Sequence, residues 1–426
     1  MNIDYEDLAD KLVNKSLSIG RKRNPNIDKA KEEYGEEIIK KIKKDPNNID
    51  QKMIRELSEP EYGPLIHEEK GRNKFKEEIG HTVVIECHPN NMKLAREIER
   101  KCLEKGAHTL LTTINKKRAI EKYELPPTDS LKELTELSRS LAEKTDYRII
   151  IEPIESTNWK KGTSKEKIAA SAPVQQKLNE IKDDNKVRWS YIGWPHPEIA
   201  EELGITYEKF KKVLKNTLEE SFKPEMKEKT QRWHEKLKNA KKIRIISEEG
   251  TDLTLDIEGR EILEDNGVLT EEDIERGDVG MNFPCGEVFT APNEEKVNGK
   301  IFIPKTAILG YGTVKELWLE FKDGRIISYS AEENEEYIGR FFEENTGNIK
   351  TIAELGIGCN KEAEYTEGYI LIDEKIEGTI HIAVGWNIGY GGKNKSSGHH
   401  DFIKPMEKGK MYADEELVMD NGKPVW

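Results

Sequence analysis

Apolar residues recur at helical spacing within the highly charged first 78 residues. The run KAKEEYGEEIIKKIKK places Ile38, Ile39 and Ile42 on one stripe of an otherwise charged helix. Such a density of charge is typical of a solvated or partner-facing surface, and a catalytic role is much less common. We therefore expect residues 1–78 to form a charged, helical N-terminal segment.

From His81 the pattern changes to short β-rich runs, with helical stretches between the first three of them. The runs are HTVVIE, AHTLLTT, DYRIIIE and KVRWSYIG. Strands that alternate with helices indicate βαβ units and a parallel sheet. A long helical tract follows over residues 207–240 and is interrupted at Pro224. The pattern predicts an α/β domain over residues 79–241 that ends in a helical connector.

After Lys241 the chain consists of strand-like pieces punctuated by turns. These pieces are IRIISEEGTDLTLDIEG, GKIFIP, ELWLEFKDGRIISYS and YILIDEKIEGTIHIAVG. The Asp323–Gly324 pair between LWLEF and RIISYS is a typical hairpin signal. We therefore predict that a strand-rich α+β domain, over residues 242–426, follows the α/β domain with its parallel sheet.

The charge and hydropathy of the chain argue against nucleic-acid and membrane partners. The 426 residues include 69 Lys+Arg and 82 Asp+Glu, for a net charge of −13. An acidic surface rich in both signs argues against a nucleic-acid partner and resembles the mixed-charge surfaces of heat-adapted proteins. The acidic N-terminus MNIDYEDLAD lacks a signal-peptide pattern, and no apolar run reaches the length of a membrane span. We expect a cytoplasmic protein with no membrane partner.

Two common kinds of site are disfavoured by motif. The first β-rich run is followed by ECHPNN and not by GxGxxG, which argues against a dinucleotide cofactor. The four cysteines are widely spaced and form no CxxC pair, so we expect structural roles in a reducing compartment. Cys285 lies beside Gly286 and Glu287, but no suitably spaced histidine supports a thiol nucleophile.

Carboxylates and histidines are concentrated in the C-terminal third, in short segments rich in turns. Two divalent cations that share a site need several hard oxygen ligands and a few imidazoles. The candidates are Glu287 in NFPCGEVFTAP, Glu354 in AELGIGCN, Glu374 in ILIDEK, His381 in GTIHIAVG, and His399 with Asp401 in SSGHHDF. Interleaved glycines would let the backbone approach an ion closely.

The spacing of these residues supports a common site. His399 and Asp401 are two positions apart, so on a strand both side chains project from the same face. This argument favours His399 over His400, although either histidine of HHD can be the ligand. His381 has small neighbours on its own face of the strand, which leaves room for an ion. A single histidine in such a strand is more often simply buried, so the prediction depends on the joint occurrence.

The order of these motifs resembles the thermophilic aminopeptidases of the AmpS, AmpT and PepS type. The resemblance covers residues 242–426, includes TDL at 251–253, and extends weakly to GWPHPEIAEELGITYEKF at 193–210. It implies a metal-dependent aminopeptidase that acts on peptides with a free N-terminus. It also implies a homodimer and two divalent ions, which are zinc or cobalt, with manganese as a further candidate.

By motif, the resemblance implies that two metal ions are held by Glu287, Glu354, Glu374, His381, His399 and Asp401. Glu354 would bridge the ions or transfer a proton. The family pattern places its acidic pair closer to the histidine than Glu374 lies here, so two alternatives are that Asp373 replaces it or that neither residue binds a metal. The family tyrosine also comes sooner after the histidine strand, and we expect Tyr390 to take its catalytic role through a shifted loop.

Two other functions stay open at this point. One is a catalytically impaired homologue that binds peptide or metal on the same fold. The other is a metal-dependent amidohydrolase that acts on non-peptide amides. The ligand set argues against loss of activity, because a cluster of like charges is costly to keep without a chemical use.

Overall fold

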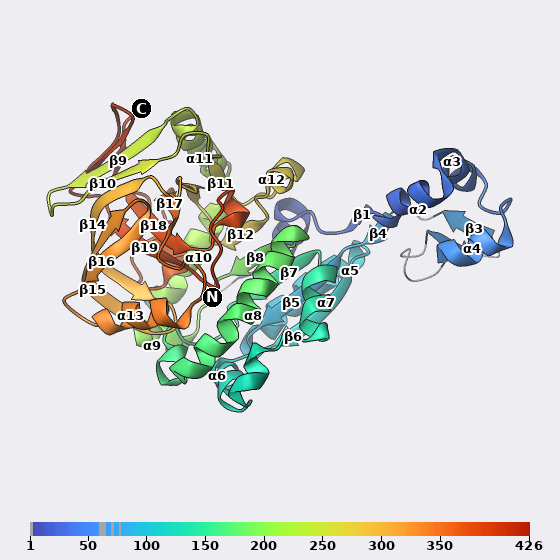
Figure 1. The fold of residues 1–426 in the computed structure, drawn as a ribbon, viewed down its shortest axis with the longest axis horizontal. Helices are drawn as coiled ribbons and strands as arrows, with labels where there is room; N and C mark the ends of the chain where they lie inside the picture. Colours follow the sequence, from blue (N-terminus) through green and yellow to red (C-terminus); the bar gives the residue numbers. More distant parts are fainter. Residues whose placement is uncertain (1–2, 59–64, 70–71, 76–77) are drawn as a thin grey trace.

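The computed structural model describes residues 3–58, 65–69, 72–75 and 78–426. Figure 1 shows a parallel sheet with its helices beside a body of antiparallel sheets, while the helices and short strands of the described residues between 21 and 80 extend to one side. Among the described residues, no helix is both long and apolar enough to cross a bilayer.

The start of the chain packs onto the α/β domain. Helix α1 (Tyr5–Asp10) runs into a π-helical turn at Lys11–Ser16. Leu8 and Leu12 are buried in the same hydrophobic core as Ile85 of the parallel sheet. These first residues therefore contribute to the core of the α/β domain.

The next residues form a small unit with its own hydrophobic core. Its helices are α2 (Asn26–Tyr34), α3 (Glu36–Lys44) and α4 (Gln51–Ser58). Of the expected stripe, Ile39 and Ile42 are buried and Ile38 is exposed. The sequence pattern did not indicate four short strands, which are β1 (Arg21–Arg23), β2 (Ile66–Glu69), β3 (Arg72–Phe75) and β4 (Glu78–Gly80). Strand β1 pairs with β4, and β2 pairs with β3.

The expected parallel sheet is present, and all of its strand pairs are parallel. Its spatial order is β12-β8-β7-β5-β6. The four predicted runs form β5 (Thr82–Cys87), β6 (His108–Thr113), β7 (Tyr147–Ile151) and β8 (Arg188–Ile192). The fifth strand, β12 (Gly280–Phe283), comes from the later part of the chain and pairs with β8. The sequence pattern had not indicated that a strand from the later part of the chain joins the parallel sheet.

Helices join these strands and lead to the second half of the chain. They are α5 (Met92–Glu104), α6 (Lys116–Glu124), α7 (Glu136–Lys144), α8 (Lys165–Asp184) and α9 (Pro197–Leu203). The predicted connector forms α10 (Tyr207–Ser221) and α11 (Pro224–Leu237). The break falls at Pro224, because proline lacks an N–H and is tolerated only in the first turn of a helix.

An eight-stranded antiparallel sheet covers one side of the C-terminal part. Its order is β16-β15-β14-β10-β9-β20-β21-β22. The strands are β9 (Lys242–Ser247), β10 (Asp252–Asp256), β14 (Val297–Ile308), β15 (Gly312–Lys322), β16 (Arg325–Ser330), β20 (Gly409–Ala413), β21 (Glu416–Asp420) and β22 (Lys423–Pro424). The predicted hairpin is confirmed: Asp323 and Gly324 have φ values of 48° and 74°, as a mirror-image turn requires.

A five-stranded antiparallel sheet packs against it and shares its core. Its order is β11-β13-β17-β18-β19. The strands are β11 (Leu263–Asp265), β13 (Glu287–Thr290), β17 (Ile352–Gly358), β18 (Thr379–Gly385) and β19 (His399–Pro405). The helices nearby are α12 (Glu271–Arg276), α13 (Glu335–Glu344) and α14 (Ile370–Asp373). The prediction of a strand at YILID is wrong, because Ile370–Asp373 of this run form the short helix α14. The domain boundaries at 78/79 and 241/242 stay a prediction.

Candidate metal centre

Four adjacent strands of the five-stranded sheet carry five of the six predicted ligands. Glu287 begins β13, Glu354 lies in β17, His381 in β18, and His399 with Asp401 in β19. The small residue Ala383 is paired with Glu354 on one side and with Asp401 on the other. Directly opposite residues project from the same face of a sheet, so the register brings these carboxylates together.

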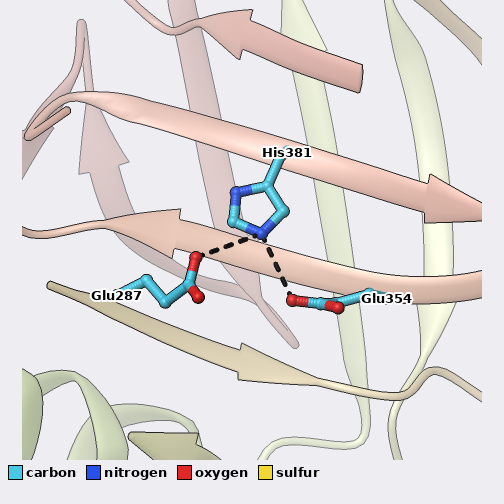
Figure 2. Close-up of side chains that lie close together, drawn as sticks. All are labelled: Glu287, Glu354 and His381. Carbon is cyan, nitrogen blue, oxygen red and sulfur yellow. Dashed lines mark hydrogen bonds and ion pairs between the residues drawn. The ribbon is translucent and has the colours of Figure 1, made fainter. Parts of the chain in front are cut away.

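The side chains meet in two groups that share Glu354. His381 Nε2 lies 3.4 Å from Glu287 Oε2 and 3.3 Å from Glu354 Oε1, as Figure 2 shows. His399 Nε2 lies 3.3 Å from Glu354 Oε2 and 3.3 Å from Asp401 Oδ1. Within each group, the ligand atoms lie within 4.8 Å of one another. Glu354 therefore presents one carboxylate oxygen to each group.

The geometry of the site fits a divalent cation. Within the described part of the chain, the buried Glu287 Oε2 accepts no hydrogen bond. Gly356 lies opposite His381, and a Cβ there would come within 2.0 Å of His381 Nε2, so only glycine leaves room for the imidazole. Carboxylate oxygens with imidazole nitrogens are the ligand set that zinc and related cations accept.

The electrostatics of the cluster also favour a cation. Burial alone would lower the pKa of His381, but Glu354 and Glu287 outweigh it and raise this pKa to about 9. Burial would raise the pKa of Asp401, yet His399 outweighs it and holds this pKa well below the usual range. The buried carboxylates are therefore stable only with positive charge beside them.

Tyr390 lies beside this cluster and faces a small cavity. Its ring contacts the rings of His399 and Phe289 edge-on, at centroid distances of 5.4 and 5.5 Å. The cavity has a volume of about 50 Å³ and is lined by Tyr390 together with Glu287, Glu354, Glu374 and His381. Trp189 of β8 and Met281 of β12 also line it. The candidate site thus lies between the parallel sheet and the five-stranded sheet.

Similarity to known proteins extends over most of the chain. The sequence matches the family described as thermophilic metalloprotease (M29) over residues 72–423. The chain belongs to this family. The resemblance expected from the C-terminal motifs is thereby confirmed, and the match extends through the α/β domain. Aminopeptidase AmpS of Bacillus subtilis is 25% identical over 295 residues, which are 63% of this chain and 70% of AmpS.

Two solved structures share the fold of this M29 protein. Wild-type AmpT from Thermus thermophilus matches with a TM-score of 0.61 at 20% identity, over 82% of this chain and 95% of AmpT. A 2,5-dihydroxypyridine dioxygenase from Pseudomonas putida KT2440 matches with a TM-score of 0.51 at 15% identity, over 81% of this chain and 91% of its own. At these identities the matches show the fold alone, which mixes a parallel sheet with antiparallel ones.

Glu374, the sixth predicted ligand, lines the cavity but belongs to neither three-residue group. Its Oε1 lies 2.8 Å from Nζ of Lys375, which is fully buried. The same ammonium contacts Glu287 Oε1 at 2.5 Å and Asp265 Oδ2 at 3.4 Å. The sequence analysis missed Lys375, although it directly follows Glu374, a predicted ligand.

Asp373, the alternative to Glu374, has a different role. Its carboxylate accepts hydrogen bonds from the N–H and hydroxyl of Thr366, both at 2.8 Å, and from the N–H of Gly368 at 2.9 Å. Burial raises its pKa to about 7 even though these donors oppose the shift. Asp373 therefore fixes the turn before α14 and does not line the cavity.

Asp265 and Asp278 are two further cavity residues that the sequence analysis missed. Both are buried carboxylates, from β11 and from the loop before β12. Burial raises the pKa of Asp278 to about 7. No local motif distinguishes these residues from the many other acidic residues of the chain.

The remaining histidine and thiol alternatives lie away from the cluster. His400 points to the other face of β19, where its ring packs against Phe341 and Phe402 at 5.2 and 4.9 Å. All four cysteines are free and buried. Burial raises the pKa of Cys285 well above its usual value, so this thiol stays protonated and is a poor nucleophile.

Proposed function

We propose that this M29 protein is an aminopeptidase that hydrolyses N-terminal residues from peptides with water activated by two metal ions. Membership of a metalloprotease family and the aminopeptidase relatives support a metal-dependent aminopeptidase. The observation that carries the two-metal proposal is Glu354, because each of its oxygens belongs to a separate three-residue group.

The ligands divide between two ions. Glu287 and His381 would hold one ion, His399 and Asp401 would hold the other, and Glu354 would bridge them. Glu374 lines the same cavity and stays a predicted further ligand. When bound, two such ions polarise a scissile carbonyl and make hydroxide available near neutral pH. The native metal is proposed to be zinc or cobalt.

Protein groups would supply the rest of the chemistry. Burial raises the pKa of Tyr390 above its usual value despite the opposing effect of His399, so the phenol stays protonated and can donate a hydrogen bond. A hydrogen bond to the carbonyl oxygen becomes stronger as negative charge develops there. The acidic cavity favours a cationic α-amine, which is the feature that separates a free N-terminus from an internal peptide bond.

The proposal is tested by metal analysis together with a panel of amino-acid anilides and N-blocked peptides. We expect about two ions per chain and release of amino acids only from substrates with a free N-terminus. Glu354→Gln should lower kcat by roughly 100-fold or more, because it removes a ligand shared by both ions. Glu407→Gln, a change at an exposed residue, is the matched control.

Each alternative outcome identifies a different function. Metal binding without turnover of any peptide or amide would indicate a catalytically impaired homologue. Turnover of N-blocked or non-peptide amides alone would indicate an amidohydrolase. Near-normal activity of Glu354→Gln would contradict the role given to that carboxylate.

A further inference from the structure

Tyr390 lies in a glycine-rich loop that other parts of the chain hold by hydrogen bonds. Residues 386–398 join β18 to β19 and include four glycines. A short 3-10 turn at Ile388–Tyr390 orders part of this loop, whereas the glycines around it leave many backbone conformations open. The ring contacts of Tyr390 with Phe289 and His399 locate it beside the metal centre. The contacts that fix the loop therefore decide where the Tyr390 hydroxyl lies.

The carboxylate of Glu294 holds both ends of the segment around Tyr390. Its Oε1 accepts hydrogen bonds from the Asn387 side-chain amide at 3.1 Å and from the N–H of Lys393 at 2.5 Å. Glu294 itself comes from the connection between β13 and β14. Burial alone would raise its pKa, but the Lys393 N–H and the charge of Arg260 outweigh burial and keep this pKa below its usual value.

Arg260 attaches the same loop to a second element. Its side chain comes from the connection between β10 and β11 and is only 10% exposed. Nη1 donates to the carbonyl of Gly391 at 2.8 Å, Nε donates to Asn293 Oδ1 at 3.0 Å, and Nη2 pairs with Glu294. A planar guanidinium with three such partners fixes the position of the backbone directly after Tyr390.

Asn387 connects this network to the strand that carries Glu354. Its side-chain amide donates to the carbonyl of Ala353 at 3.3 Å, and its oxygen accepts from the N–H of Asn394 at 2.7 Å. A Cβ on Gly392 would lie 2.1 Å from the Asn387 side chain, so the loop closes tightly around this amide. The position of the loop is thereby tied to that of the metal ligands.

We propose that Arg260, Glu294 and Asn387 form a clamp that positions the Tyr390 hydroxyl at the metal centre. The three are positioning residues, since they act on the reaction through Tyr390. The inference rests on the proposed function for its catalytic consequence, but the clamp itself is a property of the fold. It explains how Tyr390 takes its place from a loop shifted relative to the family pattern.

The clamp is tested directly by hydrogen exchange in the full-length chain. Glu294→Gln keeps the size of the side chain but removes the charge that pairs with Arg260. We expect the amides of residues 387–394 to exchange roughly tenfold faster, because hydrogen bonds to a charged group are lost. Glu295→Gln removes the same charge from the adjacent exposed residue and should leave exchange unchanged. Equal exchange in the two variants would overturn the clamp.

A double-mutant cycle tests whether the clamp acts through Tyr390. Glu294→Gln and Tyr390→Phe should each lower kcat roughly tenfold or more, with KM and bound metal little changed. The double variant should be no slower than Tyr390→Phe alone, because the clamp has nothing left to position. Multiplicative losses would overturn action through Tyr390. An inactive wild-type chain would contradict the proposed function, while the exchange comparison would still decide on the clamp.

Discussion

His399 and His400 are adjacent in the sequence but face opposite sides of β19. His399 meets Glu354 and Asp401 in the candidate metal centre, whereas His400 packs between aromatic rings. We expect His399→Ala to lower the metal content of the chain. His400→Ala should preserve metal but lower the free energy of unfolding by about 2 kcal/mol through the cavity it leaves. Metal analysis and denaturant unfolding of both variants measure this, and the reverse order of metal content would refute it.

The same alternation explains which site residues the sequence could predict. The side-chain period of a strand is a local property, so it placed His399 and Asp401 on one face without knowledge of the fold. Lys375 was missed because its main partner, Glu287, lies 88 residues earlier and only the sheet brings the two together. The role of Asp373 likewise depends on donors that a turn places around it.

At the scale of the secondary-structure element, α14 shows that the hydrophobic pattern of a short segment does not decide between a strand and a helix. A short apolar run such as YILID is compatible with a strand or a helix, and its surroundings decide. Here the chain packs against the end of the parallel sheet, where a Cβ on Gly193 would come within 3 Å of both Leu371 and Tyr369. The tertiary contacts therefore select the helix that leads into Glu374 and Lys375.

Glu152 follows β7 and holds the start of α14. Its carboxyl group should make the stability of the protein depend on pH. It accepts hydrogen bonds from the hydroxyls of Tyr191, at 2.8 Å, and Tyr369. Burial raises its pKa to about 7, although both tyrosines oppose the shift. A carboxyl with a raised folded-state pKa binds its proton more tightly when folded, so the stability it contributes falls as pH rises from 4.5 through 7 and is constant above.

Glu152→Gln should therefore change stability in a pH-dependent way. Relative to wild type, the variant should gain up to about 3 kcal/mol in free energy of unfolding between pH 4.5 and pH 8, because the buried charge is gone. Urea unfolding of both proteins at the two pH values measures this gain. Glu201→Gln, at an exposed position, should show no such change. An equal difference between Glu152→Gln and wild type at both pH values would contradict the assignment.

At the scale of the whole molecule, the two halves of the chain are interleaved. The alternation of strands and helices predicted four strands of the parallel sheet, and proline chemistry predicted the break in the connector. The fifth strand, β12, was not predicted because GMNF is short and its partner β8 lies about 90 residues earlier. This crossing brings Met281 of β12 beside Trp189 of β8, and both residues line the cavity of the candidate metal centre.

Because the centre joins several strands, the bound metal should stabilise the whole fold. The carboxylates of Glu287, Glu354 and Asp401 are largely buried. A bound cation would relieve the repulsion between their negative charges. A ligand that binds only the folded state stabilises it by about 2.7 kcal/mol at 100 times its Kd. Chelation should therefore lower the thermal midpoint by several degrees. The thermal midpoint of Glu354→Gln should shift less on chelation, because this variant lacks the shared ligand. If the wild-type midpoint stays unchanged after the loss of metal has been verified, metal binding does not stabilise the fold.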